Sequence, residues 1–511
     1  MSVSRTNSGA RGAISKRDRR VTRSRPLRVL IIINGALEHR PFYGRVGAEL
    51  IARGHDVQFL LDSHYTDFLY PEVELDASRT HYFSDYFQRH YGRTELPSEL
   101  AGSNAWTMAF PDIDRLMFTR FGPGAGDGHH YESMLANLGH FLVELFDRYR
   151  FDAVVYENVS NAIAYFSYEV AKKRGAKYLG FVPSRLPGRT DVVDYKYARD
   201  SALKEVFEQL RDGRIRAAPE VEAWVTSYLE QFDEKVPDYM GKHHPFEMGM
   251  LRRYARASSW RRFTRSVAYR FSRSNDLKFS QLADPLFVFP EQVMKEGLKH
   301  ARRFVAQHRF YDHAPNLDGK YFVYALQFHP ESATSVDGAA FNDEWSNVVG
   351  IARNLPFGMR LYVKDHKHAA GREPLAFYER VARIPNVTLV HPDVPTKALI
   401  RNAQAVVVLT TTMGYEALVL GKPVFVLGHP FYEFAPGCVR VPSFDEAHDL
   451  FARYAEFVPP REAVRALIAA YYMTSVPGSL DILTQYDDLD VVRWIADTIQ
   501  SRLGPQVETA C

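Results

Sequence analysis

Short apolar runs alternate with segments of helical periodicity in two separate blocks of this 511-residue chain. The first block opens with Arg28–Ile33, whose continuous apolar sequence is typical of a strand buried on both faces of a parallel sheet. A segment of helical spacing follows, and a second apolar run lies at Asp56–Leu61. Strand, helix and strand in this order predict a doubly wound α/β domain, which further runs at 151–156 and 177–182 continue.

A second block of the same kind follows a long irregular stretch. Between residues 321 and 427, four or five apolar runs are separated by helical segments, which predicts a second complete α/β domain. Apolar side chains then recur at helical spacing from Val491 to Ile499, so the last helix must pack on another element.

These patterns predict that the chain has five parts. The parts are a disordered basic tail at 1–27, a first α/β domain at 28–190, a mostly helical insertion at 191–317, a second α/β domain at 318–440 and C-terminal helices at 441–511. The sheets of the two α/β domains are expected to face each other across a cleft, with the C-terminal helices closing the fold. Ligands of such sheets bind beyond the carboxyl ends of the strands, so functional side chains are expected in those loops.

The net charge of +3 is divided unevenly. Residues 1–27 carry +7, which leaves −4 for the rest of the chain. An acidic body argues against nucleic acid as a partner. The chain has only two cysteines, which argues against a disulfide-rich protein, and no apolar segment long enough to span a membrane. Its N-terminus has no apolar run of the kind found in a secretory signal. We therefore expect the protein in the reducing cytoplasm.

A second basic segment lies within the expected insertion. Residues 251–273 contain eight arginines and no acidic residue. Trp260, Phe263, Val267 and Phe271 share one face of a helix among them. Such a helix can lie on an anionic membrane surface, or it can pack its apolar face on the protein and leave the arginines in solvent. The first hypothesis would place a cytoplasmic protein at the inner face of the membrane.

The segment Leu409–Leu418 carries the strongest functional signal. A strand ends in three threonines and a helix starts at once, so free backbone N–H groups and hydroxyls point to one place. A helix end of this kind suits phosphate. We assign Thr411, Thr412 and Gly414 to the phosphates of a ligand and Glu416 to its ribose hydroxyls. The alternative is that the threonines only cap the helix.

Two further strand ends of the second block carry polar side chains. Lys364 and His366 could neutralise the charge of a departing phosphate. The segment Gln327–Glu331 closes the first strand of this block, and His329 and Glu331 would open toward the same cleft. We assign Gln327 and Glu331 to the bound ligand. A solvated loop and a satisfied turn are the alternatives. His366 and His368 superficially resemble a metal-binding pair, but no other ligand cluster in the sequence supports them, and we predict no metal.

The first block offers candidates for acid–base chemistry. His39 follows the first apolar run, and its imidazole could act as a general base near neutral pH. Glu157, at the end of another run, is a rival base, and we favour His39. Arg40 and Arg185, each near a strand end, are the candidate contacts to an acceptor or another anion.

Together, these motifs resemble the capsule polysaccharide biosynthesis family, bacterial glycosyltransferases that include the Kdo transferases of capsule assembly. About 110 residues of the second block carry the resemblance. Three positions depart from the family pattern, because Lys367 replaces a proline, Asp365 a glutamate and Thr411 a glycine. The matching pieces are Gln327–Glu331 (Q-P-E-like), Arg360–His366 (K-E-H-P-like), Pro385–Val387, and Thr410–Pro423 (T-G-T-x-G-x-E-A-L, then G-K-P).

The resemblance implies a GT-B fold, in which two Rossmann-like domains bind a nucleotide-sugar donor on the second and an acceptor on the first. It implies a glycosyltransferase that acts on a glycan or lipid-linked acceptor in bacterial capsular or surface polysaccharide biosynthesis. The nucleotide-sugar is then a substrate, and neither a metal nor another cofactor is expected. Two alternatives remain: a sugar-nucleotide 2-epimerase of the same fold, and a non-catalytic polysaccharide assembly factor at the membrane.

Overall fold

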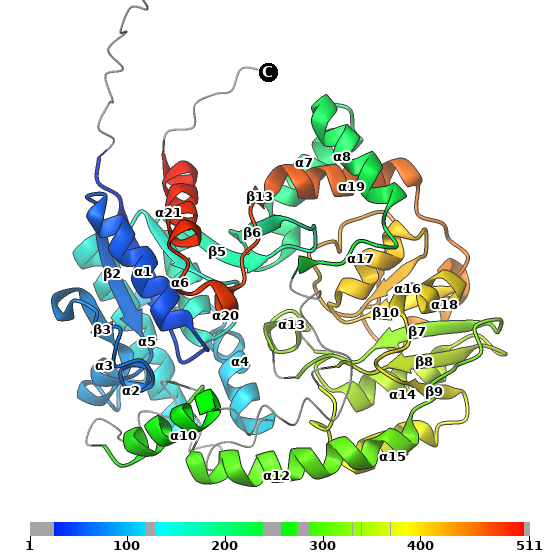
Figure 1. Cartoon of the computed structure of the whole chain (residues 1–511), viewed down its shortest axis with the longest axis horizontal. Helices are drawn as coiled ribbons and strands as arrows, with labels where there is room; N and C mark the ends of the chain where they lie inside the picture. Colours follow the sequence, from blue (N-terminus) through cyan, green and yellow to red (C-terminus); the bar gives the residue numbers. More distant parts are fainter. Residues whose placement is uncertain are drawn as a thin grey trace, which may run out of the picture.

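Two parallel sheets covered by helices form the core of the molecule (Figure 1). Of the predicted tail at 1–27, only Arg25, Pro26 and Leu27 are described, and Arg25 forms an ion pair with Asp152 (2.7 Å). The computed structural model describes residues 25–118, 128–238, 257–272, 284, 286–287, 289–329, 331–338, 340–367 and 369–504.

The first domain is built on a seven-stranded sheet of order β13-β6-β5-β4-β1-β2-β3. Strands β1 to β5 are parallel, and the chain reverses its direction of winding between β1 and β4. The sheet ends in two antiparallel strands, since β6 pairs with β5 and β13 pairs with β6. The strands are β1 (Arg28–Ile33), β2 (Asp56–Leu61), β3 (Thr80–Tyr82), β4 (Ala153–Tyr156), β5 (Lys177–Pro183), β6 (Arg189–Val193) and β13 (Val476–Pro477).

Helices cover both faces of this sheet (Figure 1). Residues Val29 to Ile33 of β1 are fully buried, as the continuous apolar run predicts for a central strand. The helices are α1 (His39–Ala52), α2 (Tyr65–Leu69), α3 (Phe83–Arg89), α4 (Ala105–Phe118), α5 (Gly128–Tyr149) and α6 (Ala162–Lys173), with short 3-10 turns at Ala77–Arg79 and Ser98–Leu100.

The second domain has a six-stranded, fully parallel sheet of order β12-β11-β10-β7-β8-β9. Alternate residues of β7 enter two separate cores, with Val323 on one face and Phe322 on the other. Its elements are β7 (Tyr321–Ala325), α13 (Ser332–Ser335), α14 (Glu344–Asn354), β8 (Arg360–Lys364), α15 (Leu375–Ala382), β9 (Val387–Val390), α16 (Thr396–Asn402), β10 (Ala405–Val408), α17 (Thr412–Val419), β11 (Val424–Val426), β12 (Cys438–Arg440) and α18 (Ala447–Tyr454).

The expected insertion at 191–317 is not a separate unit. Its start falls inside β6, and α7 and α8 pack against α19 of the second domain, where Phe207 and Val225 join the core. Helix α10 instead packs on α2 of the first domain. The elements are η3 (Ala198–Asp200), α7 (Ala202–Arg211), α8 (Pro219–Glu230), α10 (Ala257–Arg270), α12 (Pro290–Ala306), η5 (Gln307–Phe310) and α19 (Arg461–Thr474).

The C-terminal helices are shared between the domains (Figure 1). After α19 the chain adds β13 to the first sheet and continues through α20 (Ile482–Gln485) and α21 (Leu489–Leu503). Helix α21 packs beside α1, and its Ile495 and Ile499 are fully buried in the first domain's core. The predicted fold class is confirmed: two Rossmann-like domains in a GT-B-like arrangement, closed by C-terminal helices.

Candidate functional site

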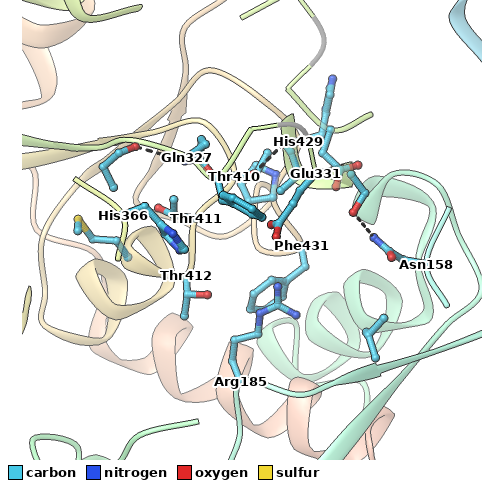
Figure 2. Close-up of a pocket in the computed structure, with 18 of the residues that line it drawn as sticks. Asn158, Arg185, Gln327, Glu331, His366, Thr410, Thr411, Thr412, His429 and Phe431 are labelled. Carbon is cyan, nitrogen blue, oxygen red and sulfur yellow. Dashed lines mark hydrogen bonds between the residues drawn. The ribbon is translucent and has the colours of Figure 1, made fainter. Parts of the chain in front are cut away.

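A cavity of about 640 Å³ lies between the two sheets. The first domain contributes the loops after β4 and β5 together with β6, and the second contributes the ends of β7, β8, β10 and β11. Figure 2 shows Thr411, Thr412 and His366 on one wall, Asn158 and Glu331 on another, and Arg185 below them. The cavity therefore lies where the carboxyl ends of parallel strands predict a ligand.

The turn between β10 and α17 forms the most polar part of one wall. Helix α17 begins at Thr412, and the preceding Thr411 makes no side-chain capping hydrogen bond. Its buried Oγ1 has no hydrogen-bond partner within the described residues, whereas Thr410 Oγ1 donates to the carbonyl of Ala333 (3.0 Å). Thr411 therefore does not act as a simple helix cap, and this residue lines the cavity together with Thr412 at the α17 N-terminus.

A lysine and a glutamate lie beside this turn. Lys364 ends β8, and its ammonium donates to the carbonyl of Pro392. Burial lowers the pKa of Lys364 to about 8 and raises the pKa of Glu416 to about 7. Each side chain shifts the other toward its charged form, so the pair places a cation and a carboxylate in the same wall.

His366 lines the cavity next to Lys364 and stacks on Phe328, with ring centroids 6.2 Å apart. Its backbone N–H donates to the carboxylate of Asp365 (2.7 Å), which also accepts a hydrogen bond from the Tyr311 hydroxyl. Burial raises the pKa of Asp365 to about 6. Asp365 thus supports the loop that presents His366.

Gly414 does not line the cavity, although the sequence assigned it to phosphate. A Cβ atom at this position would lie 2.2 Å from Oη of Tyr432. The Tyr432 hydroxyl donates to the carbonyl of Thr411, so the glycine leaves room for the side chain that holds the threonine turn.

Gly414→Ala is therefore expected to lower the free energy of unfolding by about 1–3 kcal/mol, because the added methyl must displace Tyr432. It should also weaken binding of a phosphate-bearing ligand at this turn, since the Thr411 carbonyl loses its donor. Chemical denaturation and a ligand titration measure the two effects. Gly319→Ala is the matched control, because a Cβ at 319 meets no atom within 4 Å. Wild-type stability and binding in Gly414→Ala would contradict this role of Tyr432.

The turn after β7 connects the two domains. Glu344 accepts from the backbone N–H of Gln327 (2.8 Å) and fixes the turn, while the Gln327 side chain lines the cavity. His329 and Ser335 both bind the fully buried carboxylate of Asp114, from α4 of the first domain. The satisfied-turn alternative is thus correct for the backbone, and the turn also forms part of the domain interface.

Glu331 caps the short helix α13 and lines the cavity. Burial and, to a smaller extent, the nearby Glu157 raise the pKa of Glu331 to about 7. Glu157 Oε1 accepts from the Ser160 hydroxyl (2.7 Å), and Oε2 lies 3.8 Å from Nε2 of His39. Glu157 itself does not line the cavity, but its neighbour Asn158 does, and its charge influences the cavity-lining Glu331.

The other first-domain candidates differ in accessibility. Arg185 lines the cavity, with its guanidinium 5.4 Å from the ring centre of Phe431 and 3.9 Å from Asp191. His39 begins α1 rather than lying in a loop, and burial lowers its pKa. Arg40 lies away from the cavity, where its guanidinium bonds Asp67, Thr66 and the carbonyl of Val73 and so joins α1 to α2.

Lys196, Asp337 and His429 are among the polar residues of the cavity that were missed from the sequence. The charges of Lys196 and Asp337 attract each other across the cavity lining. Burial lowers the pKa of Lys196 to about 8 and raises the pKa of Asp337 to about 8. His429 lies on the same side and follows β11, so the strand-end rule that found Lys364 could have found it. Lys196 follows β6, which the sequence did not predict as a strand because it contains no continuous apolar run.

Among the described residues, no group of three or more His, Cys, Asp or Glu side chains is placed to hold a metal ion. His368, one of the superficially metal-like pair, lies outside them. In the same part of the chain, no helix combines the length and apolar character needed to cross a membrane.

The cavity's second-domain wall coincides with a match to a known family. Residues 291–438 match the family described as capsule polysaccharide biosynthesis protein. The predicted family resemblance is confirmed. The matched region contains the 327–331 turn, Lys364, His366 and the threonine turn before α17.

Curated proteins with similar sequences match over part of their length. Capsule polysaccharide modification protein LipA of Neisseria meningitidis serogroup B is 25% identical over 167 residues, which is 30% of this chain and 23% of LipA. Capsule polysaccharide export protein KpsS of Escherichia coli is 28% identical over 128 residues, 23% of this chain and 32% of KpsS. The chain thus spans less than a third of each relative's length.

Among solved structures, the Thermosulfurimonas dismutans KpsC beta Kdo 2,4 transferase has a TM-score of 0.35 and 15% sequence identity. The alignment covers 68% of this chain and 87% of that one. No substrate is assigned from this likeness.

Proposed function

We propose that the protein is a glycosyltransferase that moves a sugar from a nucleotide-sugar donor to a glycan or lipid-linked acceptor in bacterial surface polysaccharide biosynthesis. The observation that carries the proposal is the unpartnered Thr411 hydroxyl at the α17 N-terminus, beside Lys364 and Glu416 in one cavity wall. The family match over this same wall supports it.

The donor fits this wall through three kinds of contact. Backbone N–H groups of α17, Thr411 and Thr412 would bind the phosphates, and Lys364 with His366 would neutralise their negative charge. Glu416 lies one turn further along α17, where its carboxylate could accept hydrogen bonds from ribose hydroxyls. As the bond between the anomeric carbon and the phosphate oxygen breaks, the same groups stabilise the leaving nucleotide. We therefore propose that the reaction needs no metal.

Inversion of configuration at the anomeric carbon requires a base for the acceptor hydroxyl. The sequence favours His39, whereas the geometry favours Glu157. The Glu157 side chain is 29% exposed and precedes Asn158, which lines the cavity, whereas the His39 side chain is only 9% exposed. Burial also lowers the pKa of His39, which makes its imidazole a weaker base. In this proposal the proton passes from the acceptor oxygen to Glu157 as that oxygen bonds to the sugar. Arg185, across the cavity, would contact the acceptor.

One observation favours the epimerase alternative. Glu331, Asp337 and Glu416 all line the cavity, and a sugar-nucleotide 2-epimerase needs several acidic side chains around the sugar. It needs no acceptor site and releases no free nucleotide at the end of its cycle, so the two activities differ in their products.

Incubation with CMP-, UDP- and GDP-sugars and a set of oligosaccharide acceptors tests the proposal. Release of nucleotide together with an acceptor whose mass increases by one sugar is the expected result, and its rate should survive EDTA. An epimerised donor without extended acceptor would establish the epimerase alternative. No turnover with any donor and acceptor would instead leave the assembly-factor hypothesis. Activity lost in EDTA and restored by a divalent cation would contradict metal independence alone.

A further inference from the structure

Helix α12 presents an apolar stripe to solvent. Its inner face is anchored to the second domain, where Phe304 is fully buried and His300 Nε2 donates to the carbonyl of Ala370 (2.8 Å). On its outer face, Met294, Leu298 and Val305 are 62%, 57% and 53% exposed. These positions follow helical spacing, whereas the outer face of an ordinary surface helix is polar.

Helix α10 has the same construction. Ser266 and Tyr269 are buried against the first domain, and the Ser266 hydroxyl is 2.9 Å from that of Tyr65. Of the apolar face predicted from the sequence, Trp260 is 55% exposed and Phe271, which follows the helix, is 80% exposed. The hypothesis that this face packs on the protein is therefore wrong for Trp260 and Phe271, whereas Phe263 and Val267 are half-buried.

The two helices lie next to each other along one edge of the molecule (Figure 1). Helix α10 rests on α2 of the first domain, and α12 continues toward α15 of the second. Arg270 of α10 lies 4.9 Å from the ring centre of Phe289, immediately before α12. Their exposed apolar side chains thus occur on one edge that spans both domains.

Basic side chains accompany these apolar stripes. Helix α10 contains four arginines and no acidic residue, and α12 contains four lysines or arginines and two glutamates. Arg265 is paired with Glu72 and Arg270 with Glu291, but Arg261, Lys295 and Arg302 are exposed and form no ion pair within the described residues.

We propose that the edge formed by α10 and α12 docks on an anionic phospholipid bilayer. Large apolar side chains next to unpaired basic ones are the features of helices that lie in the membrane interface, with the apolar groups below the headgroups and the cations among them. Charge complementarity selects this partner over a second copy of the chain, because two copies meeting at this edge would bring their basic residues together. The docking does not depend on which reaction the cavity performs.

Vesicle binding of the full chain tests the proposal. The protein should sediment with vesicles of phosphatidylcholine and phosphatidylglycerol, and much less with phosphatidylcholine alone or at high salt. Met294→Glu with Leu298→Glu should weaken binding by about tenfold or more for each change, and Arg261→Glu with Arg302→Glu by about fivefold or more for each. The four replaced side chains are all exposed, so the thermal unfolding midpoints of the variants should remain that of the wild type.

Two controls separate this edge from other membrane contacts. Phe357→Glu with Val458→Glu changes two exposed apolar side chains in loops outside α10 and α12, and should leave binding unchanged. Brominated lipids should quench fluorescence in the wild type more than in Trp260→Phe, because only insertion of α10 brings Trp260 to the acyl chains. Equal quenching in both, wild-type binding by the Met294→Glu/Leu298→Glu protein, or a dimer that these two changes dissociate would overturn the proposal.

Discussion

Glu157→Gln is expected to lower turnover by a factor of about 10²–10⁴ while nucleotide binding remains that of the wild type. The amide keeps the shape of the carboxylate and can still interact with Ser160, but it cannot take a proton from an acceptor hydroxyl. Because Glu157 belongs to the first domain and the proposed nucleotide contacts to the second, the loss should fall on the transfer step. Steady-state rates at saturating donor and acceptor, with nucleotide affinity from calorimetry, measure both quantities.

Two neighbouring changes serve as controls for this result. Ser160→Ala removes the 2.7 Å hydrogen bond to Glu157 but leaves its carboxylate, so most of the activity should remain. His39→Gln removes the buried imidazole 3.8 Å from that carboxylate and should lower turnover less than Glu157→Gln does. If His39→Gln abolishes transfer in a protein of normal stability while Glu157→Gln remains active, the base is His39, as the sequence favoured.

Lys364→Met is expected to weaken nucleotide binding roughly 10- to 150-fold, the range for a lost hydrogen bond to a charged group. The methionine keeps the apolar stem that fills the wall but removes the ammonium beside the α17 N-terminus. Lys422→Met is the matched control, because Lys422 belongs to the same domain and does not line the cavity. Equal affinities of the Lys364→Met and Lys422→Met proteins would remove Lys364 from the binding site.

The pH dependence of binding adds a second test of Lys364. Burial lowers its pKa to about 8, so the free protein loses this positive charge as the pH rises through that value. If phosphate binds only the protonated amine, the dissociation constant should increase about tenfold between pH 7 and pH 9. The nearby Glu416, with a pKa of about 7, becomes negatively charged over the lower part of this range. Its carboxylate repels phosphate in the wild type and in the Lys364→Met protein. Lys364→Met should therefore lose most of the slope, and an unchanged slope would assign it to other groups.

The central strands were predictable because burial on both faces demands a continuous apolar sequence. Strand β2 has the predicted bounds Asp56–Leu61, and β4 begins two residues later than expected, at Ala153. The antiparallel strand β6 was not predicted, because Arg189–Val193 mixes charged and apolar residues at a half-buried part of the sheet. The segment 191–317 was expected to be mostly helical, and α7 and α8 lie in it, but the sequence could not indicate which domain their apolar faces join.

Site residues at the ends of strands could be placed from the sequence, since parallel strands direct their carboxyl ends to one edge. Lys364, His366, Thr411 and Glu416 line one cavity for this reason. Residues whose environment depends on distant partners could not be placed. Arg40 binds Asp67, and Gly414 makes room for Tyr432; neither partner is marked by a local pattern. The relative merits of His39 and Glu157 likewise depended on burial, which only the packed first domain defines.

The position of helix α21 affects the order in which the two domains can finish folding during synthesis of the chain. The first domain emerges from the ribosome early, but Ile495 and Ile499 complete its core, and β13 completes its sheet, only when residues 476–503 have been made. The second domain receives its last core helix, α19, by residue 474. Although domains usually fold in the order in which they are translated, here the earlier domain must wait for the later one, with part of its apolar surface uncovered in the meantime.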